Sequence, residues 1–300
     1  MTIKIFDPKK NKIVEEKIYG EKFLRFLYPE KRRCSFLDKI FFLPIARWPL
    51  TSYIYGMLQK LKFSKKNILP FLKNYEIDTS EFEKRPEEFE SFNDFFIRKL
   101  KSASRSIDKD VNTAICPADG RYMIFPKVMP FHQLVVKGQT LSLSDLIGEK
   151  EFPWTGSTSV ICIRLAPVDY HRFHFPVTAE VIKQKKIKGS LFSVNPIALT
   201  KNIKYLTENK RIVTTFFHPL FKTIYMVEIG ATHVGSIIQT NTADSCIKGD
   251  EKGYFEFGGS FIVLVLENKN LVFDPLILKN SDVGIETLGK MGEFLFRAKA

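Results

Sequence analysis

The sequence predicts an α+β fold, in which an N-terminal helical region precedes a mainly β domain shaped as a sandwich or a partly open barrel. One observation is a change in apolar spacing near residue 110. Before it, apolar residues recur at helical intervals. After it, short β-branched runs alternate with turn residues, at 121–128, 160–165, 177–188, 211–217, 223–229, 234–240 and 261–267. A second observation is a hydrophobic content of 44%, enough for a large core. We expect two domains, residues 1–90 and 91–300.

The N-terminal region predicts an extended arm followed by short helices. Residues 1–19 are expected to form the arm or a strand pair, and residues 20–28 a helix that stops before Pro29. Residues 67–76 and 79–90 have the pattern of polar amphipathic helices, in which prolines occupy first turns or mark breaks.

Residues 36–58 are the most apolar part of this region. Lys39 and Arg47 interrupt the apolar run, and Pro44 and Pro49 interrupt the helix, so the segment is a poor candidate for a membrane-spanning helix. Two interpretations stay open: helices packed on a domain core, or helices that lie in a bilayer interface.

The interfacial interpretation draws on the flanking residues. Trp48, Tyr53 and Tyr55 would lie at head-group level, where amphipathic aromatic rings are favoured. The basic residues of 31–33 and the lysines of 60–66 would then meet lipid phosphates.

The charge balance points to an anionic partner. Lysine and arginine number 46 against 33 acidic residues, a formal net charge of +13, which favours nucleic acid or acidic lipid head groups. No nucleic-acid-binding motif is present, so we expect no nucleic-acid partner. The four cysteines form no Cys-x-x-Cys pair, which favours a reduced, cytosol-facing compartment. The start of the chain has no apolar run typical of a signal peptide, so none is expected.

The most informative stretch is Gly258-Gly259-Ser260, directly before the apolar run 261–266. One interpretation is a hairpin turn or bulge with a polar shoulder. The other is chemical: the Ser260 hydroxyl attacks the carbonyl carbon of Gly259, the amide becomes an ester, and elimination breaks the chain. That sequence would leave a pyruvoyl group at residue 260.

Other candidate residues are an aspartate and histidines. Asp119 lies in a turn sequence, and His171 and His174 lie between prolines. The two histidines would share a face on a helix but point oppositely on a strand. They have no obvious third ligand, so no metal site is predicted. His233 lies in a glycine-rich strand end that is typical of a tight bend, and its role is open.

A series of short polar and glycine-containing blocks follows the chain at residues 92–98, 117–120, 137–138, 167–174, 189–195, 209–211, 227–231, 234–236, 248–260, 286–287 and 290–293. In this order they resemble the phosphatidylserine decarboxylase family of pyruvoyl-dependent lipid enzymes, in its bacterial form. The likeness covers about residues 90–293 and is highly specific in combination.

This resemblance implies a self-processing proenzyme with named site residues. Asp119 would orient His174, and His174 would activate Ser260 to attack Gly259. Cleavage between 259 and 260 would give a β chain and an α chain, and Ser260 would become the covalent pyruvoyl cofactor. The resemblance further implies that this group forms a Schiff base with phosphatidylserine, and that loss of CO2 yields phosphatidylethanolamine. His171 is expected to contact the substrate carboxylate or deliver a proton.

The resemblance also implies partners and a location. The substrate would be phosphatidylserine in an anionic membrane, with the protein bound peripherally to the cytoplasmic side of the cell membrane. Many similar proteins are dimers, so a homodimer is one possible assembly.

One residue departs from the family pattern, because Phe261 stands where the cleavage motif usually has threonine. A bulky residue there could slow self-cleavage or reshape the site. The alternative function is therefore a processing-deficient relative that binds acidic lipid without turnover.

Overall fold

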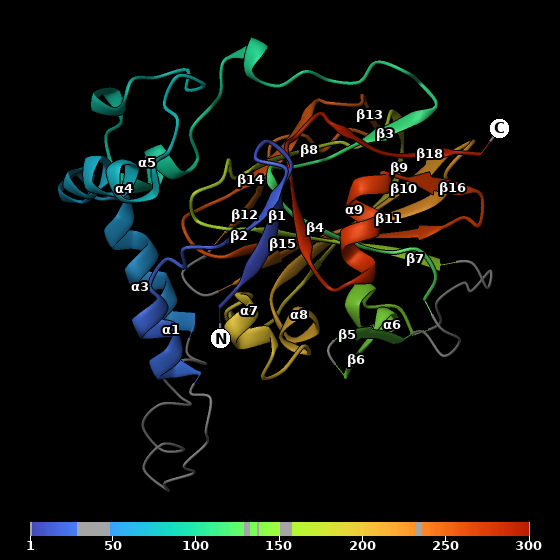
Figure 1. The fold of residues 1–300 in the computed structure, drawn as a ribbon, viewed down its shortest axis with the longest axis horizontal. Helices are drawn as coiled ribbons and strands as arrows, with labels where there is room; N and C mark the ends of the chain where they lie inside the picture. The colour runs from blue at the N-terminus through green and yellow to red at the C-terminus, as the bar shows by residue number, and fades with distance from the viewer. Residues whose placement is uncertain are drawn as a thin grey trace, which may run out of the picture.

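A computed structural model describes residues 2–28, 49–128, 133–136, 138–150, 158–231 and 236–299. It confirms the α+β class, although the large sheet is open and not closed into a barrel (Figure 1). The apolar segment 36–48 with Trp48, the basic run 31–33, Lys137 and His233 lie outside the described residues.

A mostly antiparallel ten-stranded sheet forms the centre of the molecule. In spatial order its strands are β13 (Ser245–Cys246), β9 (Ala179–Ile187), β10 (Arg211–His218), β11 (Lys222–Gly230), β15 (Ser260–Glu267), β7 (Thr158–Leu165), β4 (Gly120–Phe125), β17 (Glu286–Gly289), β1 (Lys4–Asp7) and β2 (Lys12–Glu15). The expected β runs are confirmed as strands of this sheet or of the smaller ones.

Smaller sheets and short helices surround it. The three small sheets are β12 (Ile237–Gln239), β14 (Glu251–Phe255) and β8 (Arg172–His174); β16 (Leu271–Phe273), β18 (Phe294–Ala298) and β3 (Thr113–Ile115); and β5 (Gln133–Val136) with β6 (Gln139–Ser142). The helices are α1 (Glu21–Leu27), α3 (Pro49–Lys60), α4 (Ile68–Tyr75), α5 (Phe92–Phe96), α6 (Leu143–Ile147), α7 (Pro196–Leu199), α8 (Tyr205–Glu208) and α9 (Pro275–Asp282), with 3₁₀ turns at Lys62–Asn67, Pro86–Glu88 and Ser102–Ser104.

The two faces of the central sheet carry separate cores. Along β15, Ile262 and Leu264 face a core shared with Phe173 and Phe255 of the small sheet β12-β14-β8. The alternate residues of β15 face a second core, which α6 and α8 help to cover. This alternation follows from the two-residue period of a strand. Ser260 therefore shares its face with Ile262, and Phe261 lies on the opposite face.

The N-terminal segment joins the large sheet before it turns helical. Residues 4–15 form the expected strand pair, and β1 pairs in parallel with β17, with Ile5 opposite Glu286. Figure 1 shows α1, α3, α4 and α5 gathered at one side of the sheets. The domain boundary at residue 90 stays a prediction. Within the described residues, no helix has both the length and the apolar character that crossing a membrane requires.

Two predicted helices are present and a third is not. The helix expected at 20–28 is confirmed as α1. The helix expected at 67–76 is confirmed as α4, with Pro70 in its first turn. The helix expected at 79–90 is wrong, since that segment holds only the 3₁₀ turn Pro86–Glu88. Phe82 instead forms a β-bridge with Leu100 and is buried in an aromatic cluster. Tertiary burial of its phenylalanines thus overrides the helical spacing.

A buried ion pair joins the central sheet to the small sheet whose strand β14 leads toward Gly259 and Ser260. Glu228 of β11 and Lys252 of β14 lie 2.9 Å apart, and neither side chain is more than 1% exposed. Lys252 also donates a hydrogen bond to Gln239 at 2.6 Å. Because neither charge can reach water, each is stabilised in the protein interior mainly by its partner.

Removing one partner of this pair should strongly destabilise the fold. Lys252→Met is expected to lower the free energy of unfolding by about 3–5 kcal/mol, because the Glu228 carboxylate is left buried and unpaired. Adding Glu228→Leu should recover most of the loss, since replacing both partners with apolar residues is often neutral. Urea unfolding measures the stabilities of the single and the double variant. Both are made in a Ser260→Ala background, so that only the uncleaved chain is present. A double variant less stable than Lys252→Met alone would contradict this account.

Candidate active site around Ser260

Ser260 lies at the start of a central strand, where the chain enters the protein interior. It is the first residue of β15, opposite Gly230 of β11 and Leu165 of β7, and it is fully buried. The preceding Gly258 has a φ of 145°, a conformation that glycine adopts readily and other residues rarely. The glycine thus lets the chain turn from β14 into β15 and presents the Gly259–Ser260 peptide at the strand end.

Among the histidines that the structure describes, His171 is the one that contacts Ser260. Its Nδ1 lies 3.3 Å from the Ser260 Oγ, and its Nε2 lies 3.0 Å from the carbonyl oxygen of Ala166. A carbonyl oxygen can only accept, so Nε2 carries the proton and donates it. Nδ1 is then unprotonated and accepts from the Ser260 hydroxyl. This tautomer is the one that a general base for Ser260 requires.

The surroundings of His171 keep it neutral. The ring is fully buried, and burial, with Arg98 and Arg121 nearby, holds the pKa of His171 well below its usual range. A neutral imidazole is the form that can take a proton at neutral pH. His171 therefore has both the geometry and the charge state of a base.

A tight turn before His171 holds in place the Ala166 carbonyl oxygen, to which the His171 ring donates its hydrogen bond. The Asp169 carboxylate accepts from the Ala166 N–H at 2.6 Å and forms an ion pair with Arg121. Arg98 donates to the carbonyl oxygens of Val168 at 3.0 Å and Asp169 at 2.9 Å. Sequence reasoning placed Arg98, Val168 and Asp169 in family-like blocks without giving them a role, and it did not include Arg121 in those blocks.

His174 makes different contacts from those expected. Its Nδ1 donates to the carbonyl oxygen of Gly249 at 2.9 Å, and its Nε2 lies 3.1 Å from the Tyr170 hydroxyl. In the described part of the chain, no hydrogen bond joins His174 to Asp119 or to Ser260. Strand β8 begins at Arg172, directly after His171, and on extended backbone residues three apart point to opposite sides, so in the observed arrangement the two rings do not face the same group.

Asp119 is paired with an arginine. Its carboxylate receives hydrogen bonds from Arg105, at 3.0 Å from Nε, and from the backbone N–H of Met291 at 2.9 Å. Arg105 also forms an ion pair with Glu81 at 2.8 Å. The expected Asp119–His174 contact is thus replaced by an arginine-centred network, and the catalytic roles of both residues stay predictions.

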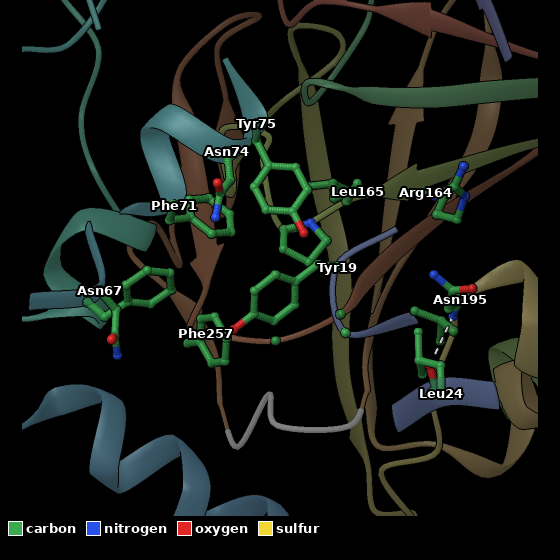
Figure 2. A pocket seen from close by; sticks show the side chains of 18 of the residues that line it. Tyr19, Leu24, Asn67, Phe71, Asn74, Tyr75, Arg164, Leu165, Asn195 and Phe257 are labelled. Atoms are coloured by element: carbon green, nitrogen blue, oxygen red, sulfur yellow. Dashed lines mark hydrogen bonds between the residues drawn. The ribbon is translucent and has the colours of Figure 1, made fainter. Parts of the chain in front are cut away.

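A cavity of about 700 Å³ opens beside the Gly259–Ser260 peptide (Figure 2). Gly258 and Gly259 form part of its wall, and the rings of Tyr19, Tyr75 and Phe257 lie around it, with Tyr19 between the other two. These residues come from the N-terminal region and from the loop of residues 256–259 between β14 and β15, so both regions build one pocket.

The pocket offers little free charge. Among the described residues that line it, Arg164 is the one charged side chain. Its guanidinium is already paired with Glu16 at 2.7 Å and with Glu286, and it is 3% exposed. The pocket is therefore an apolar and aromatic space, which suits an amphipathic ligand.

Phe261 does not crowd the Ser260 hydroxyl. It is 5% exposed and packs in the core on the opposite face of the sheet, together with Val194 and Val263. Its bulk is used in packing, and the side chain points away from the contact between Ser260 and His171.

Phe261→Thr should therefore weaken the fold and leave the cleavage chemistry in place. We expect a loss of about 3 kcal/mol in the free energy of unfolding, because a large buried ring leaves a cavity. Phe261→Leu should lose less, since it fills more of the space. Urea unfolding in the Ser260→Ala background measures stability, and a gel time course with Ser260 present measures cleavage. Faster cleavage with unchanged stability would show instead that Phe261 restrains the site.

Comparison with known proteins identifies the family. The sequence model for phosphatidylserine decarboxylase matches residues 92–296. Three proteins named phosphatidylserine decarboxylase proenzyme align over nearly the whole chain. The Chlamydia caviae protein is 41% identical, covering 99% of this chain and 98% of its own. The Chlamydia pneumoniae protein is 40% identical, and the alignment covers 97% of this chain and 95% of that protein. The Clostridium novyi protein is also 40% identical, and the alignment covers 97% of this chain and 98% of that protein. The resemblance drawn from the sequence is confirmed, and this chain belongs to the phosphatidylserine decarboxylase family of decarboxylating enzymes.

Proposed function

We propose that this chain is a self-processing proenzyme that converts phosphatidylserine to phosphatidylethanolamine and CO2. The observation that carries the proposal is the contact between the Ser260 hydroxyl and the unprotonated Nδ1 of His171, next to the Gly259 carbonyl. It supports the proposal because a hydroxyl and an unprotonated ring nitrogen meet at a buried peptide bond, beside a pocket large enough for a lipid head group.

The first stage is cleavage of the chain by its own residues. His171 Nδ1 takes the hydroxyl proton while Ser260 Oγ adds to the carbonyl carbon of Gly259. The peptide C–N bond then breaks, the nitrogen takes a proton, and an ester links the two parts. Loss of the Cα proton of residue 260 breaks its Cβ–O bond, which frees the Gly259 carboxylate and leaves dehydroalanine. Water replaces the nitrogen as ammonia leaves, and residue 260 becomes pyruvoyl.

The position of residue 260 suits that group. Residue 260 is fully buried, and the adjacent glycines line the pocket through which water and substrate would reach it. When present there, a pyruvoyl carbonyl supplies an acceptor for the electrons released as CO2 departs, as pyridoxal phosphate does elsewhere. Ala166 and Pro167 line the same pocket, so His171 and its supporting turn lie at the edge of the reaction space.

The pocket's electrostatics favour loss of CO2. A substrate carboxylate that enters meets aromatic walls and an arginine already neutralised by two carboxylates. The carboxylate thus loses its hydration and gains no salt bridge from the described lining residues, which makes its charged form unfavourable there. Expelling neutral CO2 relieves that unfavourable environment.

We also propose peripheral attachment to the cytoplasmic side of the cell membrane through the N-terminal helices. Apolar side chains stand exposed on α3, on α4 and between them: Met57 is 50% exposed, Phe63 54% and Leu69 58%. The exposed lysines 62 and 65 lie in the same segment. Exposed apolar groups among lysines suit an anionic bilayer surface.

Intact-mass analysis with a turnover assay tests the proposal. The purified protein should consist of chains 1–259 and 260–300, with the smaller chain blocked at its N-terminus by pyruvoyl. Vesicles of phosphatidylserine should yield phosphatidylethanolamine and CO2. A single chain with an ordinary serine at 260 that binds such vesicles without turnover would instead support the processing-deficient alternative.

A further inference from the structure

The stretch of chain that follows strand β2 builds part of the pocket wall and holds it on two sides. The Glu16 carboxylate forms an ion pair with Arg164 of β7 at 2.7 Å. The next residue, Lys17, donates a hydrogen bond to the carbonyl oxygen of Asn74 in α4 at 2.7 Å. Tyr19 lines the pocket itself. This stretch therefore links the central sheet to α4 beside the pocket.

Glu16 is the middle member of a buried chain of charges. It pairs with Arg164 at 2.7 Å and with Arg121 of β4 at 2.6 Å. Arg164 also pairs with Glu286 of β17, at 3.1 Å from its Nε. Arg121 also pairs with Asp169. The signs alternate along the chain, so three carboxylates enclose two arginines, and the set carries one net negative charge when all members are ionised.

The surroundings keep Glu16 charged. Its side chain is 7% exposed, and burial by itself would raise its pKa. The nearby guanidinium groups of Arg121 and Arg164 outweigh burial and hold the pKa of Glu16 below its usual range. A buried charge is only weakly screened by water and salt, so its effect extends over several ångströms. Glu16 therefore contributes to the potential that a ligand meets beside Arg164.

The pocket has an aromatic side and a charged side. Figure 2 shows Arg164 across the pocket from Phe71 of α4. The ring of Phe71 packs with Tyr19 and Tyr75, at 5.6 and 4.8 Å between centroids. An amphipathic ligand would place its apolar part against these rings, and its ionic groups would meet the potential of the Arg164 side.

We propose that Glu16 is a positioning residue for decarboxylation, because it holds Arg164 in an ion pair and so keeps the guanidinium from binding the substrate carboxylate. This inference rests on the proposed function. A salt bridge to the carboxylate would stabilise the bound substrate more than the transition state, in which that charge is being lost with CO2. Such binding slows the chemical step. An arm outside the catalytic strands would thus set how the pocket treats the one charge that the reaction removes.

Binding of two soluble lipids tests this effect without turnover. Dihexanoyl phosphatidylserine and dihexanoyl phosphatidylethanolamine differ by one carboxylate. Isothermal titration of Ser260→Ala precursors measures the Kd of each. Adding Glu16→Gln, which keeps the size of the side chain and removes its charge, should tighten the serine lipid about five- to tenfold and the ethanolamine lipid less than about twofold. Equal changes for the two lipids, or no change for either, would overturn the proposal.

Three further variants separate charge from packing. Glu286→Gln removes the other carboxylate on Arg164, so it should favour the serine lipid in the same direction, and it tests the proposal even where Glu16→Gln folds poorly. Glu16→Asp keeps the charge and should restore the starting preference. Glu149→Gln is the control: Glu149 pairs with Lys183 of β9 at 3.0 Å, and β10 and β11 separate that strand from β15. It should leave both Kd values unchanged.

Steady-state kinetics of the mature two-chain protein give a second readout. Glu16→Gln should lower KM and kcat for dihexanoyl phosphatidylserine by a similar factor, about fivefold, because the ground state is stabilised more than the transition state. A purely structural role would reduce the amount of folded protein and leave KM unchanged. A lower kcat with an unchanged or higher KM would contradict the proposal.

The binding and turnover results fail separately. If Glu16→Gln tightens the serine lipid but the protein with Ser260 never cleaves or releases CO2, the proposed function is wrong and the effect of Glu16 on the pocket stands. If turnover proceeds while the preference between the two lipids stays the same in every variant, the role of Glu16 is wrong and the proposed function stands.

Discussion

Replacing Ser260 with alanine is expected to leave one uncleaved chain that releases no CO2 from phosphatidylserine. The loss should be complete, because the same oxygen serves twice. It is the nucleophile that attacks Gly259, and it is the atom whose bond to Cβ breaks in the elimination. Alanine offers no substitute for either step, and no other hydroxyl contacts His171 among the described hydrogen bonds. A denaturing gel, intact mass and a CO2 assay on phosphatidylserine vesicles measure the two losses.

Ser159→Ala is the matched control for this substitution. Ser159 is also a buried serine of the central sheet, on β7, and its hydroxyl donates to the Pro126 carbonyl oxygen at 2.8 Å. It lies opposite Leu266, at the far end of β15 from Ser260. That control should still cleave and turn over lipid. A Ser260→Ala chain that splits after Gly259, or that decarboxylates lipid while intact, would contradict the proposed nucleophile.

Local sequence patterns predicted the cleavage strand well. The glycine pair followed by an apolar run at 261–266 indicated a buried strand, and β15 confirms it with both faces covered. Helix α4 was predictable for the same reason, because its apolar spacing and its packing agree. In both cases the local preference and the tertiary environment favour the same structure.

The partners of the candidate site residues could not be predicted in that way. Which histidine reaches Ser260 depends on the extended conformation of β8, and a His-x-x-His spacing alone fits a helix as well. The ion pair of Asp119 with Arg105 depends on how a loop fourteen residues earlier in the chain packs back onto the turn. Such contacts are set by the path of the backbone, and spacing in the sequence carries no direct record of them.

Comparing alanine substitutions at the two histidines should identify the base. His171→Ala is expected to slow self-cleavage by about 10²–10⁴-fold, the usual contribution of a general base. His174→Ala should have a much smaller effect, because its ring nitrogens contact Gly249 and Tyr170. Both rates come from the appearance of the 260–300 chain on a gel. Since burial holds the pKa of His171 well below 6.5, the rate with both histidines present should not fall between pH 7.5 and 6.

A third substitution, Asp119→Asn, completes the comparison and can reverse the assignment of His171 as the base. In the observed arrangement Asp119 neutralises Arg105. Asp119→Asn should therefore lower the free energy of unfolding, while the chains that do fold should cleave at nearly the starting rate. If His174→Ala and Asp119→Asn instead abolish cleavage while His171→Ala leaves it fast, the triad Asp119–His174–Ser260 is the working one. His174 would then have to exchange its contacts with Gly249 and Tyr170 for Ser260 before the reaction, and His171 would be left for the decarboxylation step.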